Sequence, residues 1–294
     1  MPASAYGVAL GIAVFGGAIA VYLQRRLPHS LLASRWTSLL FGASVAVAFR
    51  LATGRFPSSL WPGPLGSAEP WELVVFPLVI VTLAWPILRE LAARSMTLRL
   101  WIAMALSSLP LLIALPAGES YADVVAGNAV WSILALLAIG ANYIAGEQLD
   151  ATGATRWSLW VFVAQLFTVA ALLMTCYGTL GEWCAVAALT LGVLAGCRVL
   201  VVHDAPWSSV LALSATALSC ILLTHIRVYS TQVLPAWLAP LPMFSPVIIC
   251  SIDQLLSRHR PAWIRVVSAA AASAIVAVAV IATALSISGE GSGE

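Results

Sequence analysis

Long apolar runs, separated by short stretches that hold nearly all the charged residues, recur along the whole chain. Each run has the length of a helix that crosses a bilayer, not the ~10-residue alternating pattern of a membrane β-barrel strand. The pattern therefore predicts an all-α, polytopic integral membrane protein with about ten transmembrane helices. The ten expected spans lie at about 5–23, 33–53, 71–92, 98–115, 125–148, 157–177, 181–202, 207–226, 236–256 and 262–287.

Composition supports this class and excludes several chemistries. Apolar residues make up 61% of the 294 and charged residues only 9%, whereas soluble domains carry roughly 25% charged residues. All fourteen basic residues are arginines, so a lysine Schiff base or a phosphate-binding P-loop lysine is excluded. No soluble domain interrupts the runs. We expect one membrane domain over 1–294, with 1–150 and 151–294 as its halves.

The arginines set the expected orientation. If the N-terminus lies outside, the connections that face the cytoplasm carry eleven arginines, and the outer ones carry only Arg50, Arg55 and Arg227. The positive-inside rule predicts this asymmetry for a protein of the cell (plasma or inner) membrane. Both termini should then lie outside. The first run is followed by Arg25 and Arg26 and preceded by no basic residue, the reverse of a cleavable signal peptide.

Prolines cluster in the fourth and ninth spans, within "SSLPLLIALPAGES" (107–120) and "LPAWLAPLPMFSPVIIC" (234–250). These spans correspond in a five-plus-five inverted repeat, an arrangement that many carriers use. Proline frees a backbone carbonyl, which in hydrocarbon needs protein, water or ligand as a partner. The expected substrate-binding residues are Ser107, Ser108, Pro110, Pro116, Pro240, Pro242, Ser245 and Pro246. Ordinary helix kinks are the alternative interpretation, and the third span carries Pro77 and Pro86 with no equivalent pair in the eighth.

The remaining polar residues have two interpretations each. A set near the outer span ends either forms structural ion pairs or lines an outer mouth that attracts ions; it comprises Arg50, Arg227, His225, Glu119, Asp123 and Glu182. The polar groups nearest the span centres are neutral, and we assign them to helix packing; they are Thr82, Asn142, Gln165, Ser214, Thr216 and Ser219. On the cytoplasmic side, Arg89, Glu90 and Glu147 are expected to be solvated or paired at the surface.

No catalytic, nucleotide-binding or metal-binding motif occurs in the sequence, and no basic tract suggests nucleic-acid binding. We expect no enzyme activity, no cofactor and no metal. Cys176 and Cys184 flank a short outer loop, where either a disulfide or free thiols would fit. The preferred function is a secondary carrier, or permease, for a small solute or ion. The alternatives are a non-catalytic subunit or scaffold of a membrane complex, and an enzyme acting on lipid near Arg198, His203 and Asp204.

Overall fold

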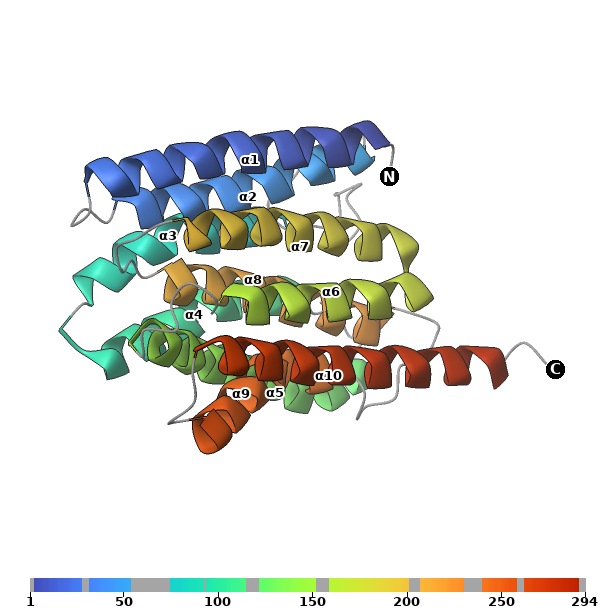
Figure 1. The fold of residues 1–294 in the computed structure, drawn as a ribbon. Coiled ribbons are helices and arrows are strands. Elements are labelled where there is room, and N and C mark those ends of the chain that lie inside the picture. The colour runs from blue at the N-terminus through green and yellow to red at the C-terminus, as the bar shows by residue number, and fades with distance from the viewer. Residues whose placement is uncertain are drawn as a thin grey trace.

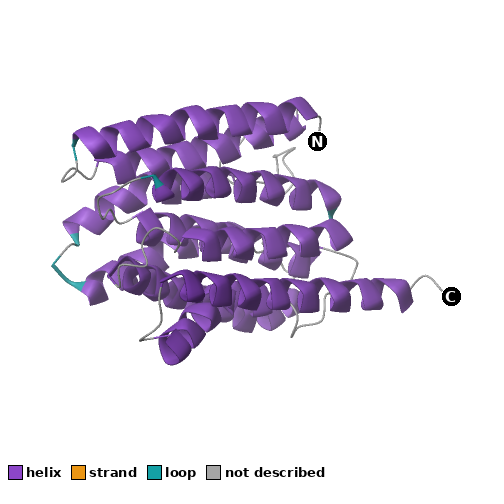
Figure 2. Ribbon diagram, in the orientation of Figure 1, coloured by secondary structure: helices purple, strands orange, loops and turns teal. Residues whose placement is uncertain are grey.

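The computed structural model describes residues 3–27, 32–53, 75–92, 94–114, 122–151, 159–200, 207–229, 240–257 and 262–290. Within these ranges the chain forms ten helices and no strand, which confirms the all-α prediction (Figure 2). The helices are α1 (Ala3–Arg26), α2 (Leu32–Thr53), α3 (Val75–Leu91), α4 (Met96–Ala114), α5 (Ala122–Ala151), α6 (Leu159–Cys176), α7 (Gly178–Val199), α8 (Trp207–Tyr229), α9 (Pro240–Ser257) and α10 (Ala262–Glu290).

Each helix lies where the sequence predicts a span, with ends that differ by a few residues. In the described part of the chain, three helices are long and apolar enough to cross a membrane: Tyr6–Arg26, Val130–Leu149 and Gly178–Val199. Five further apolar helical segments are shorter, between 10 and 17 residues. Spanning a bilayer takes about 20 apolar residues, so membrane crossing is supported for three helices and the other seven are established only as helices.

Helix α8 occupies the centre of the bundle. Every residue from Leu211 to Thr224 is buried, and α8 packs on α5, α6, α4, α3, α2 and α7. A helix that is buried on all sides belongs to the interior of a large helical protein or of a membrane bundle. The other helices surround it, and both chain termini lie at the same end of the bundle (Figure 1).

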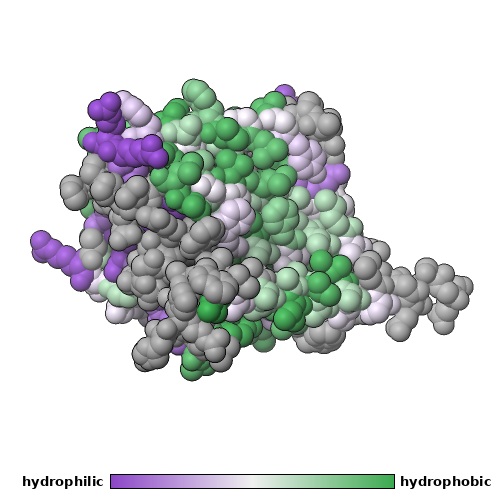
Figure 3. All heavy atoms as spheres, viewed as in Figure 1, coloured by the Kyte–Doolittle hydropathy of each residue, from purple (hydrophilic) through white to green (hydrophobic). Residues whose placement is uncertain are grey.

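The outer surface of the bundle is strongly apolar. Large hydrophobic side chains are exposed on α1, α3, α4, α5 and α10, for example Phe15 (73% exposed), Leu91 (78%) and Ile275 (69%). On the face drawn in Figure 3 apolar side chains form a broad belt, with hydrophilic side chains gathered mainly at the end where α1 stops and α2 begins. Soluble monomers rarely expose apolar patches this extensive, and a surface of this kind suits contact with lipid.

Seven described arginines gather at that same end, which we call the arginine end. Polar contacts tie the helix termini there together: Arg25 donates to the Leu200 carbonyl (3.2 Å), Arg35 pairs with Glu90, and Glu147 pairs with arginines of α3 and α4. Among the described side chains, only Glu90 and Glu147 balance them. The seven arginines are Arg25, Arg26, Arg35, Arg89, Arg94, Arg99 and Arg198.

The two halves share contacts between successive helices, such as α1 with α2 and α6 with α7, but the packing between the halves does not repeat in the described residues. Helix α5 packs on α4, α8 and α9, whereas its counterpart α10 packs on α6 and α9, with no comparable contact to α3 or α4 in the described residues. Helix α7 of the second half packs on α1 and α2 of the first. The two halves therefore interlock in one bundle, and the expected inverted symmetry is absent from the packing of these residues.

Candidate functional site

Helix α9 begins at Pro240 and contains Pro246 in its second turn. Proline fits the first helical position, where an N–H would have no partner within the helix, but inside a helix it removes one hydrogen bond. Because Pro246 has no N–H, the carbonyl of Pro242 lacks its usual donor four residues later in the chain. The helix nevertheless continues through Pro246, so other groups must satisfy its backbone.

Asn142 of α5 inserts its carboxamide into the opened turn. Its Nδ2 donates to the carbonyl oxygen of Met243 (2.7 Å), and its Oδ1 accepts from the backbone N–H of Val247 (3.2 Å). Met243 and Val247 are four residues apart, so in a regular helix this carbonyl and this N–H would bond to each other. One side chain of α5 thus bonds to both of the backbone groups that a regular helix would join by a single hydrogen bond.

Gln165 of α6 and Thr216 of α8 complete the arrangement. Gln165 Nε2 donates to the carbonyls of Pro242 and Met243 (3.2 Å each). Thr216 Oγ1 donates to Gln165 Oε1 (3.3 Å) and accepts from Asn142 Nδ2 (3.3 Å), and Ser245 Oγ donates to the Pro242 carbonyl (3.0 Å). We call Asn142, Gln165 and Thr216, together with the turn of α9 that they hold, the amide cluster.

The amide cluster lies deep inside the bundle. Asn142, Gln165, Thr216 and Ser245 are each at most 3% exposed. Asn142 and Gln165 lie about a third of the helix length from the arginine end, and Thr216 lies closer to the middle of α8, so the first turns of α9 begin inside the bundle and not at one end of it. From there α9 runs outward until Leu255 is largely exposed. The cluster carries no charge, and its donors and acceptors are all matched, so it could exchange partners with a neutral polar ligand.

The structure brings together only the α9 part of the expected substrate site. Pro242, Ser245 and Pro246 lie in the amide cluster, and Pro240 is the first residue of α9. Helix α4 does not pack extensively on α9 within the described residues, and both helices instead contact α5 and α8. The predicted crossing of the fourth and ninth helices is therefore not formed there.

The α4 residues occupy a separate region. Helix α4 runs through Pro110 without interruption, and Pro116 lies outside the described residues. Ser107 is fully buried, and its hydroxyl has no hydrogen-bond partner in the described part of the chain, whereas Ser108 donates to the Ala105 carbonyl (2.7 Å). These residues therefore make no contribution to the amide cluster.

Most of the expected outer-mouth charges lie outside the described side chains. Arg50 is exposed in the last turn of α2, and Glu182 is partly exposed near the start of α7. Asp123 belongs to α5, and His225 and Arg227 belong to α8, but their side chains are outside the described set, as is the whole of Glu119. The arrangement of this mouth thus stays a prediction.

The chemistry of the site is that of neutral hydrogen-bonding groups. No cluster of three potential metal ligands occurs among the described residues, and Cys184 is a buried free thiol, so it is not bonded to Cys176.

The sequence pattern alone assigns Asn142, Gln165 and Thr216 to packing. The signal that could have singled them out is a carboxamide within an apolar stretch, Asn142 in the second half of α5 and Gln165 in α6. No protein-family model matches the chain, and neither a curated protein nor a solved structure is significantly similar to it.

Proposed function

We propose that this chain is a multi-pass protein of the cell membrane, with ten spans, both termini outside and the arginine end in the cytoplasm. Exposed large hydrophobic side chains on many helices and the gathering of seven arginines at one end support this arrangement. Shorter helices would cross with help from local thinning of the bilayer and from their flanking arginines.

We propose further that the protein is a carrier for a small polar solute and that α9 is its moving element. The observation that carries this proposal is the turn of α9 at Pro246, whose backbone is hydrogen-bonded by side chains of α5 and α6, which in turn bond to Thr216 of α8. Discontinuous helices with backbone groups exposed at mid-depth form the substrate sites of many carriers. Here the amides of Asn142 and Gln165 occupy the positions that the polar groups of a solute would take.

The amide cluster also favours a substrate class. Its groups are two carboxamides, two hydroxyls and backbone carbonyls, with no charged side chain among them. A neutral solute with both donors and acceptors would replace these bonds at little energetic penalty. An ion would have to leave water without a compensating charge, which is far more expensive.

Cysteine labelling tests this role without knowledge of the substrate. In a variant that lacks the five native cysteines, Ser245→Cys places a thiol of similar size in the cluster, and Gln254→Cys on the exposed part of α9 is the labelling control. A carrier should show reaction at position 245 with a membrane-impermeant thiol reagent, from one side or both, and faster reaction in Asn142→Ala. Full protection at 245 with rapid labelling at 254 would contradict the carrier role.

A non-transporting subunit or scaffold is the second candidate function. The observation that favours it is the complete matching of donors and acceptors in the amide cluster, because buried amides also serve as hydrogen-bonded links between membrane helices. On this hypothesis Asn142, Gln165 and Thr216 fix α9 permanently against α5, α6 and α8. Position 245 should then stay protected in both the parent and the Asn142→Ala variant.

A further inference from the structure

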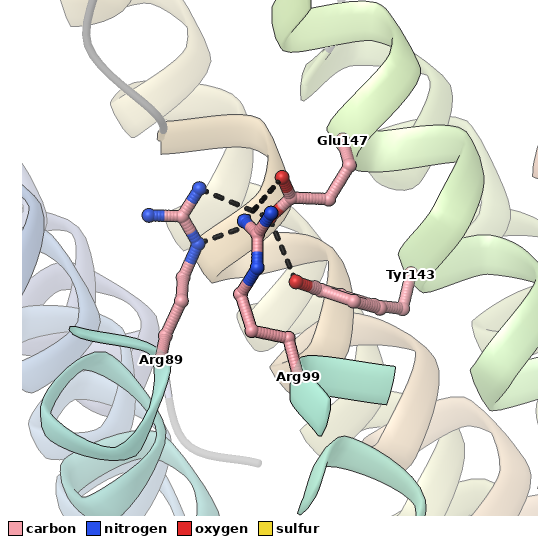
Figure 4. A network of polar contacts seen from close by, with 4 residues as sticks. All are labelled: Arg89, Arg99, Tyr143 and Glu147. Carbon is pink, nitrogen blue, oxygen red and sulfur yellow. Dashed lines mark hydrogen bonds and ion pairs between the residues drawn. The ribbon is translucent and has the colours of Figure 1, made fainter. Parts of the chain in front are cut away.

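A second polar network lies apart from the amide cluster, at the arginine end. Glu147 of α5 accepts hydrogen bonds from Arg89 of α3 and Arg99 of α4 (Figure 4). Arg89 reaches Oε1 with both Nε and Nη2 (3.0 Å each), and Arg99 Nη1 reaches Oε2 (2.8 Å). Tyr143, one turn earlier on α5, donates its hydroxyl to Oε1 (2.8 Å).

The network has more positive charge and more donors than its one carboxylate can match. Two guanidinium groups face a single Glu147, which leaves a net charge of +1. Each guanidinium carries five N–H donors, and a carboxylate offers about four acceptor sites. Arg89 commits two nitrogens and Arg99 one, while Arg99 Nε is buried with no hydrogen-bond partner among the described residues. Among the described residues, Arg89 and Arg99 therefore have one positive charge with no counter-anion and N–H donors with no acceptor oxygen.

The partial burial of the network strengthens the effect of its excess positive charge. The side chains of Arg89, Arg99 and Glu147 are only 15%, 17% and 14% exposed, so water screens the positive charge poorly but can still reach it. On the inner side Tyr143 is fully buried and packs edge-to-face on Trp85, with ring centroids 5.1 Å apart. The network is therefore a partly exposed cationic site that packs on two buried aromatic side chains.

We propose that this site binds a phosphate group through the N–H groups of Arg89 and Arg99 that do not face Glu147. Planar guanidinium groups bind phosphate oxygens in pairs, and such charge-assisted bonds strengthen where water is partly excluded. The phosphate could belong to an anionic lipid headgroup or to a soluble phosphate compound, and both would meet the same donors. This inference is independent of the carrier role, because it uses none of the residues of the amide cluster.

Thermal unfolding of the purified full chain in nanodiscs tests the site in two arms. One arm compares phosphatidylglycerol with phosphatidylcholine discs. The other titrates inorganic phosphate into phosphatidylcholine discs at constant ionic strength, with chloride as the balancing anion. A rise of the unfolding midpoint in the first arm alone assigns the site to a lipid headgroup, and a rise in the second assigns it to soluble phosphate. No rise in either arm overturns the proposal.

Three variants connect the effect to these residues. Arg99→Gln should increase at least tenfold the phosphate concentration that gives half of the rise in unfolding midpoint. Arg94→Gln, which removes an exposed arginine nearby, should leave this concentration unchanged. Glu147→Gln removes the competing carboxylate and should tighten binding by about tenfold. A network that only ties helices together would lose stability in Glu147→Gln with no gain in affinity. That result, or equal effects of Arg99→Gln and Arg94→Gln, would refute phosphate binding here.

Discussion

Asn142 Nδ2 lies 2.7 Å from the carbonyl oxygen of Met243, which makes this the shortest hydrogen bond of the amide cluster. A side chain of α5 thereby donates to a backbone carbonyl of α9. Backbone hydrogen bonds within a helix break only when the helix unwinds, but a side-chain bond can break by rotation about χ angles. The first turns of α9 are thus held by contacts that can be exchanged while the helix stays intact.

Replacing Asn142 with alanine should destabilise the fold by about 1–3 kcal/mol, since the Met243 carbonyl and the Val247 N–H would lose a buried partner. Gln148→Ala is the matched control, because Gln148 is an exposed amide on the same helix that also bonds to α9, through Gln254. An exposed substitution of this kind should change stability by less than about 0.5 kcal/mol. Reversible unfolding in mixed micelles measures both values. Equal effects would show that the amide cluster does not hold α9.

Pro246 and Gln165 should be energetically coupled. Pro246→Ala restores an N–H that can bond to the Pro242 carbonyl, so Gln165 is no longer needed as its donor. Gln165→Leu should then destabilise the Pro246→Ala background less than the parent, by about 1 kcal/mol in a double-mutant cycle. The same unfolding assay on the four proteins gives the coupling energy. A value near zero would mean that Gln165 serves some purpose other than the opened turn.

The hydrophobic pattern was sufficient to predict the helices, because their length and apolarity are local properties of the sequence. All ten expected spans correspond to helices, and the arginines expected on one side lie together where they are described. Trp183 shows where local reasoning fails. It lies near the start of the seventh expected span, where tryptophan usually sits at the lipid headgroup level, yet it is 2% exposed and donates to the Val45 carbonyl of α2 (3.0 Å). Only the packing of α7 against α2 decides that, and no local pattern encodes it.

The candidate site was predicted in part for the same reason. Pro246 has no N–H, so this one residue is sufficient to predict a backbone carbonyl without its usual donor. Which groups satisfy that carbonyl depends on how four helices associate. The sequence suggested α4 as the partner through the symmetry of a repeat, whereas Gln165 of α6 donates to this carbonyl and Asn142 of α5 bonds to the next one. Glu147 illustrates the same limit: it was expected to be solvated or paired at the surface, whereas its side chain is only 14% exposed and pairs with Arg89 and Arg99 of two other helices.

The close approach of α6 and α7 should make Gly181 intolerant of a side chain. A Cβ at this position would lie 2.7 Å from the backbone nitrogen of Met174, which cannot move aside as a flexible side chain could. Gly181→Ala should therefore destabilise the protein by about 1–3 kcal/mol. Gly196 lies on the same helix, and a Cβ there would meet no neighbouring group within 4 Å, so Gly196→Ala should be neutral or stabilise by up to about 1 kcal/mol. Unfolding midpoints of the two variants should move in opposite directions or differ clearly in size.

The proposed topology makes a prediction that fusion reporters can test. A chain that crosses ten times with its N-terminus outside has an outer C-terminus, and chains truncated after α5 or α9 should end in the cytoplasm. Alkaline phosphatase, which is active only outside, should be active when fused after residue 294 and inactive after residues 151 and 257, where α5 and α9 end. Green fluorescent protein fusions should give the opposite pattern. If only the three candidate spans Tyr6–Arg26, Val130–Leu149 and Gly178–Val199 crossed the membrane, the C-terminus would lie on the opposite side from the N-terminus. A fluorescent fusion at residue 294, with the N-terminus shown to be outside by its own tag, would therefore contradict ten spans.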